Sequence, residues 1–376
     1  MKAGGDGIRL DDEQRLAWLR LIRSENVGPV SFRQLINRFG SASAALDALP
    51  SLASRGGSKA IRIATVDQVR READFAASRG ARFIALGEPE YPAALAAADA
   101  PPPVLAVLGS TETLTNSSVG VVGSRNSSLA GIKMCERVAV GCGRAGYTVV
   151  SGLARGIDAA AHRVSLATGT VACMAGGLDK PYPPENVPLM EDIVASGGAL
   201  VSEQPFGWEP RSRDFPRRNR LIAGLSLAVI VIEAAHRSGS LITARLANEM
   251  GRLVFAVPGS PLDPRSAGAN GLIKQGASIL TDAKDVIDAI EPLSIAQDNA
   301  QPQLFEDGPA DNAIDEPADG ERERIVEALG PAPIPIDELQ AHVGAKPGVV
   351  QAVLLELDLA GQLERHEGNY VSLNLG

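Results

Sequence analysis

Between about residue 80 and residue 290, short apolar segments alternate with longer segments in which apolar residues have helical spacing. The short segments are rich in valine, isoleucine and leucine, and are expected to be strands at residues 118–122, 148–150, 170–174, 199–202, 227–232 and 253–257. Continuous apolar strands separated by longer helices are typical of a parallel sheet covered on both faces. The alternation therefore predicts an α/β domain at residues 80–290, with a Rossmann-like doubly wound parallel sheet.

The first part of the chain, residues 1–79, is expected to be helical. Asp11 and Asp12 precede one segment with helical apolar spacing, and a second such segment follows residues 26–31 and ends at Gly40. Two helices around a glycine-containing turn predict a helix-hairpin-helix (SAM-like) domain, whose hairpin can place backbone N–H groups against a DNA phosphate. A small helical packing domain without a DNA contact is the alternative.

The composition of the chain changes twice toward its C-terminus. Residues 291–320 hold four prolines and eight acidic residues, with no lysine or arginine and no apolar periodicity, so we expect an acidic disordered linker. Residues 321–376 have the pattern of three helices followed by two short strands around a turn at Gly368. This order predicts a winged-helix domain.

The net charge has to be divided by region before it can be interpreted. The chain carries 36 Lys+Arg and 45 Asp+Glu, and a net charge of −9 argues against a nucleic-acid binder. Residues 1–290, however, carry 32 bases and 28 acids, a net charge of +4, whereas the expected linker carries −8 and the expected winged helix −5. A mildly basic body is compatible with nucleic-acid binding. The acidic linker could compete with DNA, which is a hypothesis.

Small residues follow three of the expected strands, in the loops Gly123–Arg125, Ser151–Asp158 and Ser238–Ser240. The carboxyl ends of parallel strands meet at one edge of a sheet, so the loops are expected to lie at this ligand-binding edge. Each loop opens a helix whose free N–H groups favour an anion, and Arg125 and Arg155 add charged contacts. We therefore expect phosphate binding. The GxGxxG and GxxxxGK[ST] fingerprints are absent, so an NAD or ATP enzyme is not favoured.

Residues 211–220 contain five arginines and one acid, a local charge of +4. An arginine cluster with an asparagine and an aromatic residue suits a nucleic-acid backbone, and Phe215 is a candidate stacking platform. The alternatives are a surface network of ion pairs and a protein interface.

No catalytic, metal-binding or cofactor-binding set is expected. The four histidines lack metal-ligand spacing, there is no GxSxG motif, and Asp158 with His162 fits a helix cap better than an acid–base pair. The three cysteines form no CxxC and are expected to be buried thiols in a reducing compartment. No signal peptide or membrane insertion is expected, which predicts a cytoplasmic protein.

Eight motifs follow one another between residues 121 and 276: VVGSR, SGLARGIDA, GLDKPYPPEN, ALVSE, FPRRNRLIAGLS, IEAAHRSGSLITA, GRLVFAVPG and GANGLIKQG. Together they resemble the DNA-processing protein A (DprA/Smf) family. The resemblance implies a homodimeric protein that binds single-stranded DNA, protects incoming DNA and loads the RecA recombinase in natural transformation (competence) and DNA recombination. It also implies that the protein is not an enzyme.

The loops, the arginine segment and the resemblance together give the candidate DNA-binding residues. They are Gly123, Ser124, Arg125, Ser151, Gly152, Arg155, Gly156, Lys180, Arg217, Arg218, Asn219, Arg220, Ser238, Gly239, Ser240 and Asn270.

The chain departs from the family pattern after Tyr182-Pro183. Many relatives have a lysine or arginine there, whereas this chain has Pro184 and Glu185, and Lys180 is the expected substitute for the missing charge.

Two alternative functions remain. A nucleotide phosphoribohydrolase would need a PGGxGTxxE motif, of which this chain has only the beginning at Pro258-Gly259. A duplex-DNA regulator would use the winged helix, whose expected recognition helix offers Lys346 as its one base and includes Glu356 and Asp358. That surface suits a protein partner better than phosphate.

Overall fold

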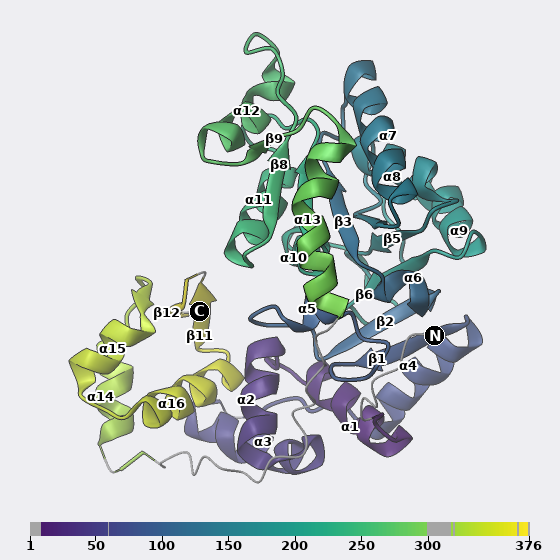
Figure 1. The fold of residues 1–376 in the computed structure, drawn as a ribbon. Coiled ribbons are helices and arrows are strands. Elements are labelled where there is room, and N and C mark those ends of the chain that lie inside the picture. The colour runs from purple at the N-terminus through teal and green to yellow at the C-terminus, as the bar shows by residue number, and fades with distance from the viewer. Residues whose placement is uncertain (1–8, 59, 299–316, 319, 367, 375–376) are drawn as a thin grey trace. The chain divides into compact units, whose positions relative to one another are not determined.

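The computed structural model describes residues 9–58, 60–298, 317–318, 320–366 and 368–374, and the chain divides into two units. One unit contains Glu72–Gln303 together with the first nine residues. The other contains Leu10–Arg71 and Leu304–Gly376, so a segment from the N-terminal part and one from the C-terminal part of the sequence belong to the same unit. Figure 1 labels the elements of both units.

The larger unit, called the α/β unit below, is built on one nine-stranded sheet with the strand order β1-β2-β6-β5-β4-β3-β7-β8-β9 (Figure 1). Its strands are β1 Ala81–Ala85, β2 Val104–Gly109, β3 Ser118–Val122, β4 Thr148–Ser151, β5 Thr170–Cys173, β6 Ala199–Ser202, β7 Ala228–Val231, β8 Leu253–Ala256 and β9 Ser278–Ile279. The chain starts the parallel part at β3, continues to one side through β4, β5 and β6, and then crosses to the other side for β7, β8 and β9. All neighbours from β6 to β9 pair in parallel. The Rossmann-like doubly wound prediction is confirmed.

The sheet is mixed because its first two strands, which the sequence pattern did not reveal, are antiparallel. β1 pairs with β2, and β2 pairs with β6, in antiparallel register. The connection between β1 and β2 contains only the short helix α5, Ala93–Ala96. Parallel neighbours are usually joined by a crossover that contains a full helix, whereas residues 86–103 contain only the single turn of α5, which fits an antiparallel pair.

Helices cover both faces of the sheet. On one face lie α7 Leu129–Arg144, α8 Ile157–Ser165, α9 Val187–Ala195 and α13 Ala283–Asp298, and on the other lie α10 Asp214–Leu225 and α11 Gly239–Glu249. The shorter elements are α6 Thr111–Thr115, α12 Ala267–Lys274 and the 3-10 turns at Pro184–Asn186 and Pro264–Ser266.

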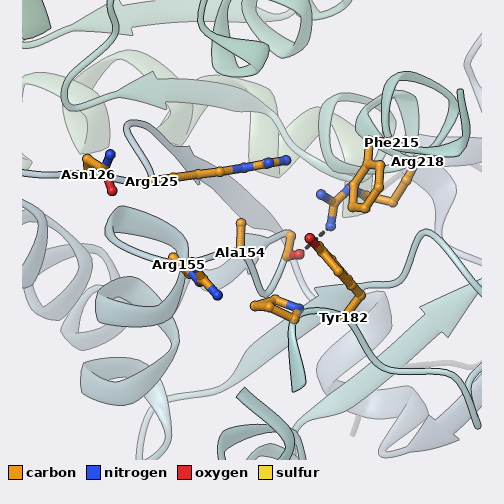
Figure 2. A pocket seen from close by; sticks show the side chains of 9 residues that line it. Arg125, Asn126, Ala154, Arg155, Tyr182, Phe215 and Arg218 are labelled. Atoms are coloured by element: carbon orange, nitrogen blue, oxygen red, sulfur yellow. Dashed lines mark hydrogen bonds between the residues drawn. The ribbon is translucent and has the colours of Figure 1, made fainter. Parts of the chain in front are cut away.

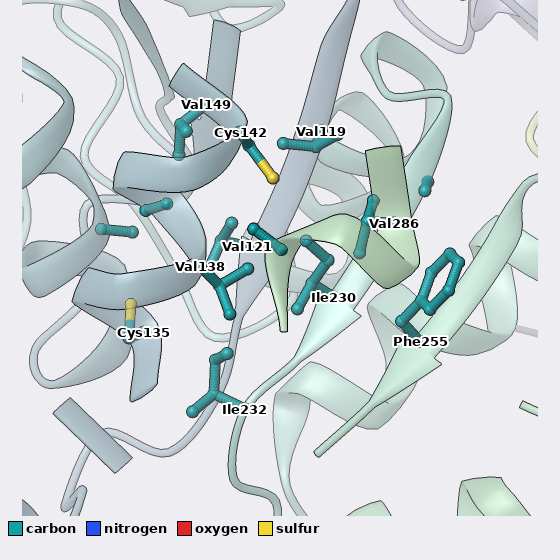
Figure 3. Close-up of a cluster of buried hydrophobic side chains, with 14 of the residues drawn as sticks. Val119, Val121, Cys135, Val138, Cys142, Val149, Ile230, Ile232, Phe255 and Val286 are labelled. Carbon is teal, nitrogen blue, oxygen red and sulfur yellow. The ribbon is translucent and has the colours of Figure 1, made fainter. Parts of the chain in front are cut away.

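Figure 3 shows how α7 and α13 pack on the central strands through small and branched side chains, with Val138 of α7 and Val286 of α13 against β3 and β7. Cys135 and Cys142 belong to this core and are fully buried. Burial raises the pKa of the Cys142 thiol to about 12. The prediction of buried, unpaired thiols is confirmed.

Helix α13 continues past residue 290 to Asp298 and has Pro292 inside it. The beginning of the segment expected to be a disordered linker is therefore helical. Val286 and Ile290 are completely buried in the core, which anchors this helix before the proline. Residues 299–316, the greater part of that expected linker, lie outside the described residues.

The second unit, called the helical unit below, combines helices from both ends of the chain. The N-terminal helices are α1 Asp12–Arg23, α2 Pro29–Phe39 and α3 Ala42–Arg55. Helix α4 Val66–Ser78 has residues in both units, because the division falls between Arg71 and Glu72. The C-terminal elements are α14 Glu321–Ala328, α15 Ile336–Val343, α16 Pro347–Leu359, and strands β10 Ile334–Pro335, β11 Leu363–His366 and β12 Tyr370–Leu373. Asp11 caps α1 by accepting the Gln14 N–H at 2.7 Å, and left-handed Gly40 ends α2, as expected. Helix α3 and strand β10 were not anticipated from the sequence.

Candidate nucleic-acid interface

A pocket of about 230 Å³ opens at the carboxyl edge of the sheet in the α/β unit (Figure 2). Its lining combines three cations, two aromatic rings and small residues: Arg125, Asn126, Gly152, Ala154, Arg155, Tyr182, Pro183, Phe215 and Arg218. Pockets for drug-sized ligands usually have about 300–1,000 Å³, so this one suits a phosphate or part of a nucleotide better than a whole cofactor.

The pocket lies where the strand order reverses. Its residues follow β3, β4 and β5, or belong to α10, which leads into β7. β3 is followed by a crossover to one side of the sheet, and β7 by a crossover to the other side. Open α/β sheets bind ligands in the crevice at such a switch point. The expectation that the loops after β3 and β4 meet at this edge is confirmed.

Two glycines let the loops after β3 and β4 approach each other and the arginine helix. Gly156 has φ +73°, and a Cβ there would lie 2.3 Å from the Ser124 carbonyl oxygen. A Cβ on Gly152 would lie 2.3 Å from a guanidinium nitrogen of Arg218. A residue with a Cβ does not fit at either position without moving its neighbours, and glycine therefore permits this close approach.

The exposed side of the pocket has an aromatic and cationic surface. The Arg125 guanidinium lies 5.6 Å from the centre of the Phe215 ring. Tyr182 meets Phe215 edge to face, with ring centres 5.5 Å apart and an angle of 68°. Tyr182 is 49% exposed. Both rings are thus placed where a nucleobase can stack, which supports the stacking role expected for Phe215. Tyr182 was missed as a site residue, although the Tyr-Pro motif was the available signal.

Asp214 shapes the start of the arginine segment. Its buried carboxylate accepts the Trp208 indole N–H at 2.9 Å and the Arg211 backbone N–H at 2.9 Å. Arg211 in turn lies over the Trp208 ring, 4.9 Å from its centre. These contacts fix the beginning of α10 and thereby the direction in which Phe215 and Arg218 leave the helix.

Arg218 is a buried arginine at the bottom of the pocket, with 6% of its surface exposed. It donates hydrogen bonds to the carbonyl oxygens of Gly152 and Cys173, the latter at 2.7 Å. Burial lowers the pKa of Arg218, and the negative charge of Asp158 opposes that shift. Arg218 thereby ties the ends of β4 and β5 together, and it contributes positive charge to the pocket from below.

Asp158 is buried under the loop after β4. Its carboxylate accepts the Gly152 N–H at 3.2 Å and the Ala154 N–H at 3.4 Å, so it shapes the loop as a cap. Burial raises its pKa, and the nearby Arg218 opposes this. His162 lies fully buried on the same helix, contacts Thr170 Oγ1 at 2.7 Å, and has a pKa lowered to about 3 by burial. Both side chains are thus hydrogen-bonded within the protein, and Asp158 holds the loop before α8, whose N-cap is Gly156.

The remaining expected cations differ in how they are engaged. Arg155 forms an ion pair with Glu185 at the pocket, Lys180 pairs with Glu209 at 2.7 Å, and Arg220 pairs with Glu203. Arg220 also donates to the Ala100 carbonyl oxygen at 2.7 Å, which makes it the most engaged of these cations.

Arg217 is exposed and has no ion-pair partner among the residues that the structure describes. Arg125 is also exposed, with Phe215 as its contact. These two arginines are the cations most accessible to a phosphate.

Several side chains that were expected to contact DNA form hydrogen bonds with backbone groups of the protein itself. Ser151 is fully buried and donates to the Val121 carbonyl oxygen at 2.6 Å. Asn219 accepts from Arg218 at 3.2 Å and donates to the Gly239 carbonyl oxygen at 3.2 Å. Asn270 exchanges two hydrogen bonds with the Gly259 backbone, at 3.1 and 2.9 Å.

The loop Ser238–Ser240 caps α11, with 2.7 Å between the two serine hydroxyl oxygens. Of the expected residues, the pocket brings together Arg125, Gly152, Arg155 and Arg218. Arg217, Arg220, Lys180, the loop Ser238–Ser240 and Asn270 are not part of its lining, although Arg217 and Arg220 were expected there. The DNA contacts of all these residues remain predictions.

Within the described ranges, no group of three or more histidine, cysteine or carboxylate residues has a geometry that could hold a metal ion. Over the same residues, no helix is long and apolar enough to cross a membrane.

Three family models match the chain. The model described as DNA recombination-mediator protein A matches residues 82–291. A DprA-like N-terminal HHH domain matches residues 12–74, and a DprA winged helix domain matches residues 309–369.

Relatives and solved structures agree with these matches. Protein Smf of Escherichia coli (strain K12) is 38% identical over 290 residues, which are 75% of each chain. The putative DNA processing protein DprA of Mycobacterium tuberculosis is 35% identical over 331 residues, 82% of each chain.

The crystal structure of DNA processing protein A from Streptococcus pneumoniae superposes with a TM-score of 0.58 at 33% identity, covering 75% of this chain and 98% of that one. The structure of DNA processing protein A from Helicobacter pylori, which concerns its single-stranded DNA binding mode, superposes with a TM-score of 0.51 at 27% identity. That match covers 56% of this chain and 96% of the other.

Proposed function

Because this chain belongs to the DNA recombination-mediator protein A family, we propose that it binds single-stranded DNA at the pocket of its α/β unit. The observation that carries the proposal is the combination of accessible arginines and two aromatic rings at the switch point of the sheet. The Helicobacter pylori relative, whose structure concerns single-stranded DNA binding, supports the same ligand.

In this proposal the arginines hold the backbone and the rings hold bases. Arg125 and Arg217 are exposed and take phosphates, while the buried Arg218 adds positive charge below. A base of a single strand stacks on Phe215 or Tyr182, which a paired base inside a duplex cannot do. The pocket therefore favours single strands over duplexes.

The expected binding has weak sequence preference and strong salt dependence. Phosphate contacts carry no sequence information, and every base has a face that can stack. If Arg125 and Arg217 each neutralise one phosphate, and Arg155 exchanges Glu185 for a third, the affinity falls with salt with a log–log slope of about −2, since each contact contributes roughly −0.7 on a single strand.

We further propose, from membership of the family, what the protein does with the bound DNA. The protein protects incoming DNA and loads the RecA recombinase during natural transformation and recombination, acting as a cytoplasmic homodimer. The Rossmann-like domain at residues 80–290 does the binding, and the chain also carries the helical domain at residues 1–79 and the winged helix at residues 321–376.

We also propose that the protein has no turnover chemistry. The buried His162, with a pKa of about 3, stays neutral, and Asp158 is engaged by backbone N–H groups. Neither group is set up as a general acid or base near neutral pH. Release of base from nucleoside monophosphates by the pure protein would contradict this part.

The test of DNA binding uses the double variant Arg125→Ala/Arg217→Ala and a fluorescent oligo-dT. Loss of two charge-assisted contacts, at about 1.5 kcal/mol each, predicts roughly a hundredfold weaker binding. Arg163→Ala is the matched control, because Arg163 is exposed in the last turn of α8, away from the strand-end loops. Equal affinity of the double variant and the wild type, in a gel-shift or anisotropy titration, would show that the pocket is not the binding site.

A further inference from the structure

The winged helix packs on the N-terminal hairpin domain of the same chain. Asn26, Val27 and Gly28 form the hairpin between α1 and α2, and Asn26 has a positive φ of 58°. A hairpin of this type can turn its backbone toward a DNA phosphate. The side chain of Asn26 in this hairpin is in contact with the C-terminal end of α16.

The contact at the hairpin is a hydrogen bond to a helix end. Asn26 Nδ2 donates to the carbonyl oxygen of Leu359, the last residue of α16, at 3.0 Å. Left-handed Gly361 follows, and a Cβ there would lie 3.1 Å from the same Asn26 nitrogen. The C-terminus of a helix carries partial negative charge, so α16 presents to the hairpin the same sign of charge as a phosphate.

Helix α16 also lies against α3 at close range. A Cβ on Gly56 would lie 2.0 Å from the Glu356 carbonyl oxygen and 2.9 Å from the Ala360 Cβ. Gly56 has φ −75°, a value that any residue adopts, so its small size serves this contact. Farther along α16, Gln34 Nε2 donates to Gln351 Oε1 at 2.8 Å.

A buried carboxylate joins the two domains. Glu356 is 1% exposed and accepts two hydrogen bonds from Arg322 of the winged helix, at 2.8 and 3.2 Å. Arg55, at the end of α3, approaches the same carboxylate at 3.7 Å. A buried charge is retained only when it is paired, and this one is paired from both sides of the contact.

The burial of α16 is unlike that of a helix that reads DNA. Its buried residues are Val349, Val350, Ala352, Val353, Leu354, Leu355, Glu356, Leu357 and Leu359, which cover nearly its whole circumference. A recognition helix keeps one polar face exposed for the major groove, whereas a helix that is apolar all round is buried on all sides. The two domains are also complementary in charge, since residues 10–71 carry ten bases and six acids, and residues 321–376 carry −5.

We propose that the acidic winged helix is an intramolecular ligand of the hairpin domain and occupies, with the end of α16, a site for the DNA phosphate backbone. While docked, α16 does not read duplex DNA and the hairpin does not bind it. When the winged helix is released, the hairpin domain gains affinity for the backbone of a duplex. This site is separate from the pocket of the α/β unit, and the proposal does not depend on what the pocket binds.

Docking is tested in the full chain by cross-linking the variant Gln34→Cys/Gln351→Cys with a short bismaleimide. The native thiols do not compete because all three are buried, and burial raises the pKa of Cys142 and Cys173 to about 12. We expect a cross-link within one chain, seen as a changed mobility in a denaturing gel and absent from each single-cysteine variant. A folded double variant that does not cross-link contradicts docking.

The masking of a DNA site is tested by opening the contact from either side. Gly56→Leu and Ala360→Leu place a larger side chain at the same point of contact, one in each domain. Both should suppress the cross-link and raise the affinity for a 20-base-pair duplex by about threefold or more, as the binding-competent population grows. Ser51→Leu, at an exposed position of α3, is the control and should change neither result.

Competition between duplex DNA and the docked winged helix can be tested without Gly56→Leu or Ala360→Leu, in the protein that carries only the two introduced cysteines. Because coupling between two ligands is reciprocal, saturating duplex should slow cross-linking of the cysteine pair. An unchanged cross-linking rate with bound duplex overturns the proposal. The proposal is also overturned if Gly56→Leu or Ala360→Leu abolishes the cross-link without raising the affinity for duplex. A gain that disappears when Lys346→Glu is added would assign binding to α16 and also overturn it.

Discussion

The pocket of the α/β unit and the hairpin of the helical unit are two places where this chain could hold a phosphate, and they differ in what covers them. At the pocket, Arg125 and Phe215 face outward, and the acids that approach it, such as Glu185, are themselves exposed. At the hairpin, Asn26 is bonded to the end of α16. The glycine loops thus form an open pocket, whereas the glycine-containing hairpin is bonded to the Leu359 carbonyl oxygen of the same chain. A phosphate-binding motif therefore predicts a capacity to bind an anion, whereas the packing of the surrounding chain determines whether the site is accessible.

The largest expected effect comes from adding a side chain at Gly156, where the loops after β3 and β4 are in close contact. Gly156→Val puts a Cβ 2.3 Å from the Ser124 carbonyl oxygen at φ +73°, so the loops after β3 and β4 must separate. We expect a loss of stability of about 3 kcal/mol or more and loss of oligo-dT binding. Denaturant titrations and anisotropy measure the two effects. Gly271→Ala, in a helix with open space around it, should change neither.

An intermediate effect concerns the free energy of unfolding of the α/β unit, which we expect to decrease in acid because of His162. His162 is buried in the α/β unit with a pKa of about 3, whereas the unfolded chain takes up this proton near pH 6.5. Since the unfolded state then binds more protons, stability falls as the pH drops below 6.5, by about 2 kcal/mol at pH 5. Asp158, with its raised pKa, contributes the opposite slope, and therefore the wild type is compared with His162→Gln, which keeps Asp158.

The two tryptophans assign the acid effect to a unit. Trp18 belongs to the helical unit and Trp208 to the α/β unit. In a Trp18→Phe background, urea titrations followed by Trp208 fluorescence should show the loss at pH 5, and His162→Gln should reduce it. Equal pH dependence with and without His162 would refute this prediction.

A smaller effect tests base stacking. Phe215→Ala removes the ring between Arg125 and Tyr182, and we expect roughly tenfold weaker binding of oligo-dT, because one stacked base is worth about 1–3 kcal/mol. Duplex affinity should not change, since paired bases do not reach the ring. An equal loss for both ligands would mean that Phe215 supports the fold of the site and does not stack on bases.

The smallest expected effect concerns the acid in the pocket loop. Glu185 pairs with Arg155, and this hydrogen bond lowers the pKa of Glu185. Glu185→Gln frees Arg155 for a phosphate, and we expect a two- to threefold gain in oligo-dT affinity at low salt, about the size of an exposed ion-pair effect. Glu191→Gln, which removes an exposed acid on α9, is the control. A weaker binding of Glu185→Gln would show that the pair orders the site.

The alternation of strands and helices was sufficient to predict the doubly wound sheet, because a buried strand such as Ala228–Val231 must be apolar along its whole length. It could not reveal β1 and β2, which pair in antiparallel register through a connection without a full helix and so lie outside the alternation of strands and helices. The sequence could single out Arg125 and the glycine loops, of which Arg125 and Gly152 line the pocket, because close approach of two backbone segments demands small residues.

Other features of the site could not be found in the same way. The buried state of Arg218 and the ion pair of Arg155 with Glu185 arise between segments distant in sequence. The docking of α16 on α3 likewise joins the two ends of the chain, and it is signalled only by the apolar character of the whole helix.

The most direct test of the open pocket is a salt titration of the whole chain with oligo-dT and with a duplex of the same length. We expect the single strand to bind at least about tenfold more tightly, with a log–log salt slope near −2. A duplex that binds as tightly as the single strand, or an affinity for oligo-dT that does not change with salt, would contradict it.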